Sequence, residues 1–177
     1  MPTELALVHI EAQRRLRMIS TTAVERIWQD LPGYNREHLD QWLTRVLPVV
    51  NGARRQSIRL TDAYLARALE RGPMGIDADE IADSIRAGVT TEEVYERPFV
   101  TTWTSLKGGA LWTDAVATGM ARASSAMAAD VQLAMRDAVS QIGEADDSIF
   151  GFERVPNPGA CDLCLIASTQ RYGTGDL

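Results

Sequence analysis

Apolar residues recur every three or four positions along most of the chain, which is the spacing of one face of an α-helix. The first stripe predicts a helix that begins after Thr3, whose hydroxyl can cap its first turn, and that ends at the turn 31–35. The second stripe predicts a helix over 36–70, capped by Asn35 and kinked or broken at Pro48, because proline removes a backbone donor. The residues expected to face the core are Leu5, Val8, Ala12, Leu16, Ile19, Ala23 and Ile27, followed by Leu39, Leu43, Val46, Val50, Ala53, Ser57, Leu60, Tyr64 and Ala68.

The middle of the chain is divided by turn and capping signals. Residues 71–75 read as a linker, because glycine and proline favour turns. Residues 77–80 and 90–93 each resemble a capping box flanked by apolar residues, which predicts the start of a short helix at both places. We expect these two helices to be broken by Gly88 and by Pro98 and to form a small helical connector.

A long alanine-rich helix is predicted next. Residues 99–106 indicate either another helix or an extended arm, and the two glycines at 108–109 indicate a hinge. The proline-free stretch 110–142 predicts the long helix, which Gly143 should end. Its expected core stripe consists of Trp112, Val116, Met120, Ala123, Met127, Val131, Ala134, Ala138 and Ile142.

The last residues change in character. Residues 149–155 predict a strand and 156–159 a turn, after which the chain ends without a completed hairpin. We therefore expect a mainly α protein, an elongated helical bundle followed by the start of a small α+β C-terminal domain. Its parts would be an N-terminal helical hairpin (1–72), connector helices with the long alanine-rich helix (73–145), and an incomplete β and turn segment (146–177).

The amino-acid composition excludes several classes of protein to which the chain could belong. The chain has 177 residues, 45% hydrophobic and 24% charged, which is typical of a soluble globular protein. Two cysteines exclude a disulfide scaffold, and two histidines argue against a histidine-based catalytic network. We expect no membrane partner, because no apolar run reaches the roughly 18 residues of a spanning helix, and the first residues lack the apolar region of a secretory signal.

Charge is distributed unevenly along the chain. The net charge of −6 argues against a general nucleic-acid binder. Residues 1–72 carry 11 Arg and 8 acidic residues, a net of +3, whereas 73–177 carry 7 basic and 16 acidic residues, a net of −9. Such halves can pair within one chain, pair with other copies of the chain, or face different partners.

Cys161 and Cys164 are the sharpest candidate site. Two thiols separated by two residues in a tight turn can face one metal, but a structural zinc needs four ligands. The pair could therefore be half of a zinc site, a pair of reduced thiols in a turn, or a redox pair. Zinc becomes a possible cofactor only if the other ligands come from outside this chain or from beyond Leu177; the chain offers no other cofactor motif.

Arg54, Arg55 and Arg59 cluster on the second helix. They form either a solvated helix face or a patch that binds a partner, nucleic acid included. No serine elbow and no phosphate-binding glycine loop is present, so we expect no catalytic residues and a protein that is not an enzyme.

Residues 152–172, which read FERVPNPGACDLCLIASTQRY, resemble the minor head proteins of tailed phages related to the Mu F protein, in the form carried by actinobacterial phages and prophages. The similarity is specific over about residues 150–177 and looser over the helices. The cations, 17 Arg and one Lys, fit such a host. Members commonly continue with further His and Cys residues, which would complete a cluster with the positions of Cys161 and Cys164.

The resemblance implies a structural role in the virion head, with assembly in the host cytoplasm. Such proteins sit in few copies near the portal, so the expected partners are the portal protein, the major capsid or scaffold protein, and other copies of the chain. Two alternatives remain open: a capsid maturation protease, or part of a fusion to one, and a cytoplasmic helical adaptor unrelated to phage.

Overall fold

The computed structural model describes residues 3–86, 88–146, 149, 151–153 and 170–173. Within these residues the chain is mainly α-helical, as the hydrophobic periodicity predicts, and it contains two very short strands. The elements are α1 (Glu4–Gln29), α2 (Arg36–Ala68), α3 (Ala78–Ser84), α4 (Thr91–Lys107), α5 (Trp112–Ala145), β1 (Phe152–Glu153) and β2 (Arg171–Tyr172).

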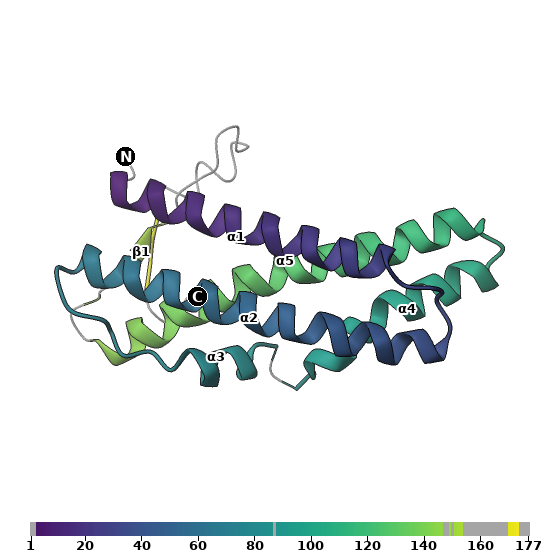
Figure 1. Ribbon diagram of the computed structural model, residues 1–177. Helices are drawn as coiled ribbons and strands as arrows, with labels where there is room; N and C mark the ends of the chain where they lie inside the picture. The colour runs from purple at the N-terminus through teal and green to yellow at the C-terminus, as the bar shows by residue number, and fades with distance from the viewer. Residues whose placement is uncertain (1–2, 87, 147–148, 150, 154–169, 174–177) are drawn as a thin grey trace.

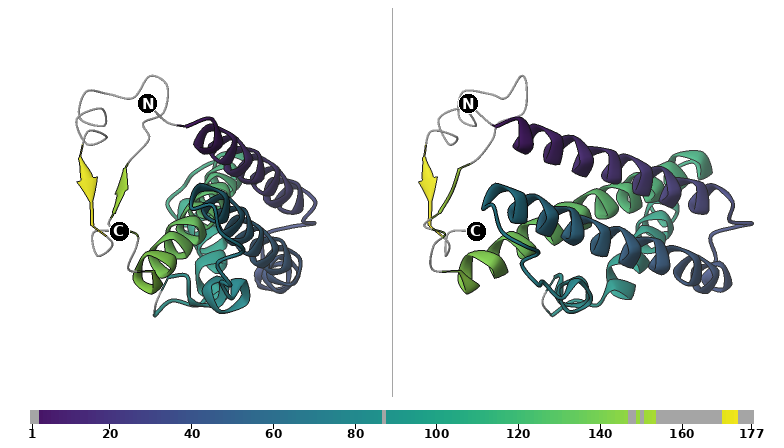
Figure 2. Two further views of the ribbon diagram at one scale, coloured as in Figure 1. Left: turned by 90° about the vertical axis from the view of Figure 1, so that its left-hand side faces the viewer. Right: turned by 60° about the vertical axis from the view of Figure 1, so that its left-hand side comes forward.

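The long helices lie lengthwise in an elongated bundle (Figures 1 and 2). Helices α1 and α2 form a hairpin, and α5 packs against both of them. Helix α4 forms a second hairpin with α5 and also contacts α2, while the short α3 lies against α2 and α5. The segments 1–72 and 73–145 therefore share one helical core.

The helices begin where the capping residues predict. The Thr3 hydroxyl accepts from the backbone N–H of Ala6 at 3.2 Å, and the Asn35 side chain accepts from that of His38 at 3.1 Å. Asp77 caps α3 and Thr90 caps α4 in the same way. Each cap satisfies a backbone donor that has no partner within its own helix, so these four starts were readable from local chemistry.

The predicted helix ends at Pro98 and Gly143 are wrong, and of the kink or break expected at Pro48 the structure excludes the break. Helix α2 continues through Pro48, helix α4 continues through Pro98, and helix α5 passes Gly143 and ends at Ala145. Pro98 removes one helical donor but is itself buried, and Gly143 is also buried. Tertiary packing therefore compensates for the poor local helix propensity of Pro98 and Gly143.

An aromatic cluster forms the main core where the two hairpins meet. The rings of Trp28 and Trp42 lie edge to face with centroids 5.1 Å apart, and Phe99 packs edge to face on Trp28 at 5.1 Å. The indole of Trp42 donates to the backbone carbonyl of Tyr95 at 2.7 Å. These side chains come from α1, α2 and α4, so burial of large aromatic surfaces holds the helices in register.

A second cluster closes the other end of the bundle. Ile58 from α2 packs with Ile81 and Ile85 at α3 and with Ala134 and Ala138 of α5. The small alanines let α3 and α2 approach α5 closely, which is how a helix of only seven residues is held in place.

The predicted core stripe of α1 is wrong at Val8 and Ile19, whereas Leu16 and Ile27 do pack against the core. The residues that face the core are Ala6, Gln13, Ser20, Val24 and Trp28. Val8 and Ile19, both expected to be buried, are among the most exposed hydrophobic residues of the described chain. The apolar residues of α1 do not coincide with its buried residues, because two of the positions that face the core carry the polar side chains of Gln13 and Ser20.

At the C-terminal end, β1 pairs with β2 in antiparallel register, with Phe152 opposite Tyr172. β1 lies inside the predicted strand 149–155, in a shorter form. Cys161, Cys164 and the rest of the predicted C-terminal α+β domain lie outside the described residues.

Candidate functional site

A buried ion pair joins the two halves of the bundle. Arg54 on α2 donates from Nη2 to the Oδ2 atom of Asp130 on α5 at 2.9 Å, and both side chains are almost completely shielded from solvent. Burial of a guanidinium or a carboxylate is costly unless the charge is paired and hydrogen-bonded. The two residues therefore depend on each other.

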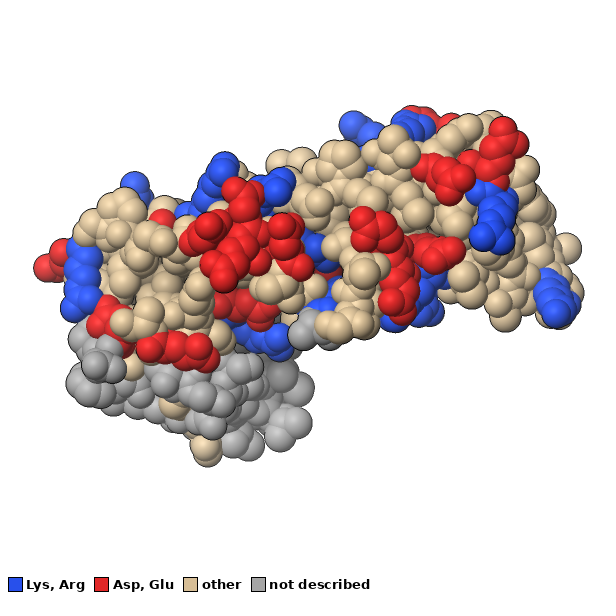
Figure 3. Space-filling view, turned by 90° about the horizontal axis from the view of Figure 1, so that it is seen from below, with Lys and Arg blue, Asp and Glu red and all other residues tan. Residues whose placement is uncertain are grey.

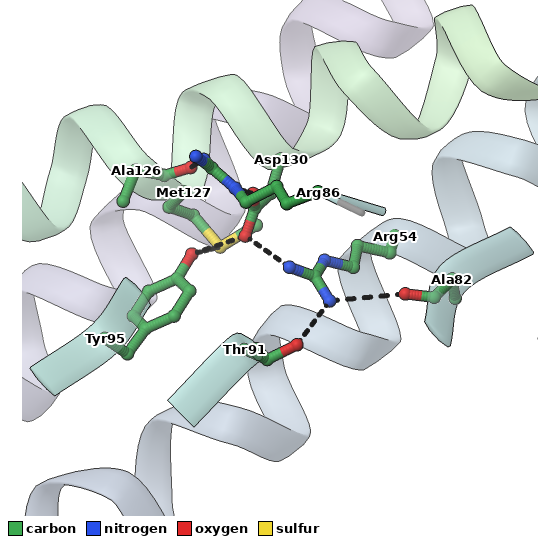
Figure 4. Close-up of polar contacts among 8 residues, drawn as sticks. All are labelled: Arg54, Ala82, Arg86, Thr91, Tyr95, Ala126, Met127 and Asp130. Carbon is green, nitrogen blue, oxygen red and sulfur yellow. Dashed lines mark hydrogen bonds and ion pairs between the residues drawn. The ribbon is translucent and has the colours of Figure 1, made fainter. Parts of the chain in front are cut away.

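The Asp130 carboxylate is shared by three donors (Figure 4). Besides Arg54, the Arg86 Nε atom donates to Oδ1 at 2.6 Å and the Tyr95 hydroxyl donates to Oδ2 at 3.1 Å. Burial, followed by the negative charge of Asp130, raises the pKa of Tyr95 far above its ordinary value, so the phenol keeps its proton. The carboxylate thus ties α2, α4, α5 and the segment after α3 to one point.

Arg54 also holds α3 and the start of α4. Its Nη1 atom donates to the Thr91 hydroxyl at 2.7 Å and to the Ala82 carbonyl at 3.2 Å (Figure 4). Its buried Nε atom has no hydrogen-bond partner among the residues that the structure describes. Arg86 has a positive φ of 67°, which is uncommon for a residue with a side chain. Its contact with Asp130 offsets that strain, so the network is a structural lock that positions the connector.

The arginine cluster expected on the surface of α2 does not form one patch. Arg54 points into the core and is fully buried, so its assignment to a solvated or partner-binding face is wrong. Arg55 is half-buried and pairs with Asp79 at α3, which leaves Arg59 as the exposed member of the three. The reason is geometric: Arg54 lies next to the buried Ala53, on the side of α2 that faces α5.

The uneven charge of the chain is partly neutralised within the molecule. Among the described residues, ion pairs join the basic half to the acidic half at Arg54 with Asp130, at Arg55 with Asp79, and at Arg71 with Asp146. Exposed acidic side chains still gather over α3 and the start of α4, as the view from below shows (Figure 3). Pairing within one chain, one of the three predicted outcomes, is therefore confirmed for these residues.

A second polar cluster explains the phase of α1. The Gln13 side chain donates to the Ser57 carbonyl at 3.0 Å and to the Thr61 hydroxyl at 3.2 Å. The Ser57 hydroxyl lies 2.9 Å from the Gln13 Oε1 atom and 2.8 Å from the Val131 carbonyl oxygen. Since these buried polar groups satisfy one another, α1 can turn a polar residue to the core and leave apolar residues outside.

The outward side of α1 carries two exposed apolar pairs. Leu7 and Val8 are 53% and 59% exposed, and Met18 and Ile19 are 54% and 65% exposed. An open groove of about 680 Å³ runs along this helix beside α2; it is lined by Glu4, Leu7, Val8, Glu11, Ala12, Arg15, Leu16, Ile19, Gln56 and Leu60. Apolar patches of this kind on a protein surface mark sites of interaction with another molecule.

Charged side chains separate the two apolar pairs. Glu11 accepts from Arg14 at 2.7 Å and from Arg15 at 2.7 Å, on the same face of the helix. These two hydrogen bonds lower the pKa of Glu11 to about 2, so the carboxylate is ionised across the physiological range. We call this surface, made of residues 7, 8, 11, 15, 18 and 19, the outer α1 face.

His9 gives the helical hairpin a dependence on pH. Its ring stacks on that of Tyr64 with centroids 4.5 Å apart, and burial lowers its pKa below 6.5. The unfolded chain binds the proton first as pH falls, so the contribution of His9 to stability is present above the ordinary pKa of 6.5 and should be lost as pH falls below it. Urea unfolding of wild type and His9→Phe, which keeps a ring for stacking, should show a smaller loss in the variant. An equal loss in both proteins would mean that His9 has no part in the effect.

No metal cluster or membrane-spanning helix is found in the part of the chain that the structure describes. No three His, Cys, Asp or Glu side chains there lie close enough together to hold a metal ion. None of the helices there combines the length and apolar character needed to cross a bilayer. Cys161 and Cys164 belong to neither finding, since they lie outside the described residues.

Comparison of the chain with protein-family models, with curated proteins and with solved structures gave no match in any of the three searches.

Sequence reasoning missed Asp130, Arg86 and Tyr95. A signal for Asp130 was present, because it is the one charged residue between Met127 and Ala134 on the predicted core side of the alanine-rich helix. A lone carboxylate on an apolar face indicates a buried partner of opposite charge. Nothing in the local sequence identifies Arg54 as that partner, since the two residues are 76 positions apart.

Proposed function

We propose that this chain is a structural assembly subunit of a tailed-phage head and acts in procapsid assembly near the portal. The observation that carries the proposal is the outer α1 face, where four apolar side chains are each more than half exposed. A helix face of this kind is expected to be covered by another protein. The sequence similarity of residues 152–172 to Mu F-related minor head proteins supplies the context of the phage head.

The helical body suits a non-enzymatic role. The aromatic core and the hydrogen bonds of Gln13 to α2 fix α1 relative to the other helices, so the outer α1 face is presented in one orientation. A preorganised surface loses less entropy when it binds than a flexible one. The candidates for the covering protein are the portal protein, the major capsid or scaffold protein, and a second copy of the chain, within a head that assembles in the host cytoplasm.

The test is co-assembly. Portal, major capsid and scaffold proteins from the genome that encodes this chain would be produced with it, and procapsids purified by gradient sedimentation. The chain should co-sediment with the particles in few copies and leave the scaffold and capsid proteins intact. Its exclusion from particles would contradict the assembly role, and specific cleavage of scaffold or capsid protein by the purified chain would point instead to a maturation protease.

A further inference from the structure

We propose that the outer α1 face binds the same face of a second copy of this chain, with the two α1 helices antiparallel. The inference rests on the proposed function, because it names the partner that covers the surface used in assembly. It is carried by the order of apolar and charged residues along α1.

The two apolar pairs lie on one side of the helix. Leu7 and Val8 are 11 positions from Met18 and Ile19, which is about three helical turns, so each pair lies directly above the other. This side is opposite the buried line of Ala6, Gln13 and Ser20. It is therefore free to meet another helix along several turns.

The face reads as a palindrome about the level of Gln13. If two α1 helices cross there in antiparallel orientation, Leu7 of one copy lies opposite Ile19 of the other, and Val8 lies opposite Met18. Glu11 then lies opposite Arg15, in both halves of the interface. A two-fold interface requires this arrangement, because whenever residue i contacts residue j of the partner, j also contacts i.

Charge distinguishes the second copy and its orientation. A parallel pair in register would place Glu11 against Glu11 and Arg15 against Arg15, and like charges facing each other are unfavourable. The antiparallel pair matches each acid with a base. A partner of different sequence would need a surface that complements this face, but nothing would then require the face to complement itself. The face does complement itself, and this favours a second copy.

The contact area between two α1 helices is small, so the dimer should be weak. A single helix pair buries less than the roughly 1,200 Å² at which stable interfaces begin, so dimerisation should be weak and dependent on concentration. Copies held close together in an assembling particle would associate far more readily than free ones. The central charges are exposed, so salt should weaken the dimer further.

Sedimentation equilibrium of the purified full-length chain at low salt tests the inference. The wild type should show a monomer–dimer equilibrium in the micromolar range, and Val8→Glu with Ile19→Glu should remain monomeric. The matched control is Val100→Glu, which alters a hydrophobic residue of α4 that is 47% exposed, and it should dimerise like the wild type.

A charge exchange tests the register. Glu11→Arg or Arg15→Glu alone should weaken dimerisation by about tenfold or more, because each places like charges opposite each other. The double variant restores the match and should recover most of the affinity. Circular dichroism of each variant would verify that helix content is unchanged, which is expected because both side chains are exposed.

Three results would overturn the inference: a wild type that is monomeric at all concentrations, a Val100→Glu variant that loses dimerisation as the face variant does, or a double charge exchange that fails to restore binding. The measurement uses the chain without any head protein. A monomeric wild type would therefore contradict this inference but leave co-assembly standing, whereas a dimer that is excluded from procapsids would contradict only the proposed function.

Discussion

Replacement of Asp130 by asparagine is expected to lower the free energy of unfolding by about 3–5 kcal/mol, because removal of one partner leaves a buried charge uncompensated. The side chains of Arg54 and Asp130 are 1% and 0% exposed, so water cannot solvate the guanidinium that remains. Asparagine keeps the shape of the side chain, and the loss therefore reports on charge rather than on a cavity. Arg86 and Tyr95 would lose their charged acceptor at the same time.

The control is Asp137→Asn, one heptad further along α5. Asp137 is partly exposed and its ion pair with Arg136 is long, at 3.4 Å, so the change should stay within about 0.5 kcal/mol. Urea unfolding followed by circular dichroism measures both variants. If Asp130→Asn were as mild as the control, the buried network would not be the lock between α2, α4 and α5.

Gly119→Ala should be the second most damaging change, with a loss of about 1–3 kcal/mol from overpacking. A Cβ atom at this position of α5 would lie 2.2 Å from the Thr102 hydroxyl oxygen, 2.7 Å from the Trp28 ring and 2.9 Å from the Pro98 carbonyl oxygen. Three helices meet at this point, and one of the contacts is backbone that cannot turn aside. The steric cost should exceed the roughly 1 kcal/mol that alanine gains over glycine in a helix.

Gly52→Ala is the matched control, because it makes the same change in the interior of α2. A Cβ atom there meets nothing within 4 Å, so the variant should be more stable by up to about 1 kcal/mol. Thermal unfolding of the two variants should therefore shift in opposite directions. A shift in the same direction would mean that the close approach of α4, α5 and Trp28 at Gly119 is wrong.

Much of the fold could be predicted from local chemistry. Thr3, Asn35, Asp77 and Thr90 cap the helices that their side chains predict, and the alanine-rich stripe from Ala123 to Ile142 does face the core. Helix caps and strong periodicity depend on residues that are close in sequence, so they can be predicted without knowledge of the tertiary structure.

The remaining differences come from long-range contacts. Pro98 should break a helix by propensity, but its burial against α5 keeps α4 intact. Gln13 looks like a surface residue until Ser57 and Thr61 of α2 supply its hydrogen bonds. Because polar residues occupy positions of α1 that face the core, the apolar residues predict a buried face that lies to one side of the true one.

The candidate site also has features that the sequence predicts and features that depend on long-range contacts. The charge imbalance between the halves of the chain was visible in the sequence, but the pairing of Arg54 with Asp130 was not, because no local pattern joins residues so far apart. Of the apolar residues of the outer α1 face, the periodicity includes only Val8 and Ile19, and it assigns both of them to the core. The interaction surface emerged only once the buried side of the helix was known.

The most direct test of an assembly role for the outer α1 face is the amount of chain incorporated into procapsids. Quantitative mass spectrometry of purified particles would compare wild type, Val8→Glu with Ile19→Glu, and Val100→Glu, each produced at equal levels. We expect the face variant to fall at least about tenfold below wild type, because it places charges on a surface that must be covered, and Val100→Glu to match wild type. Equal incorporation of all three proteins would contradict the role of the outer α1 face in head assembly.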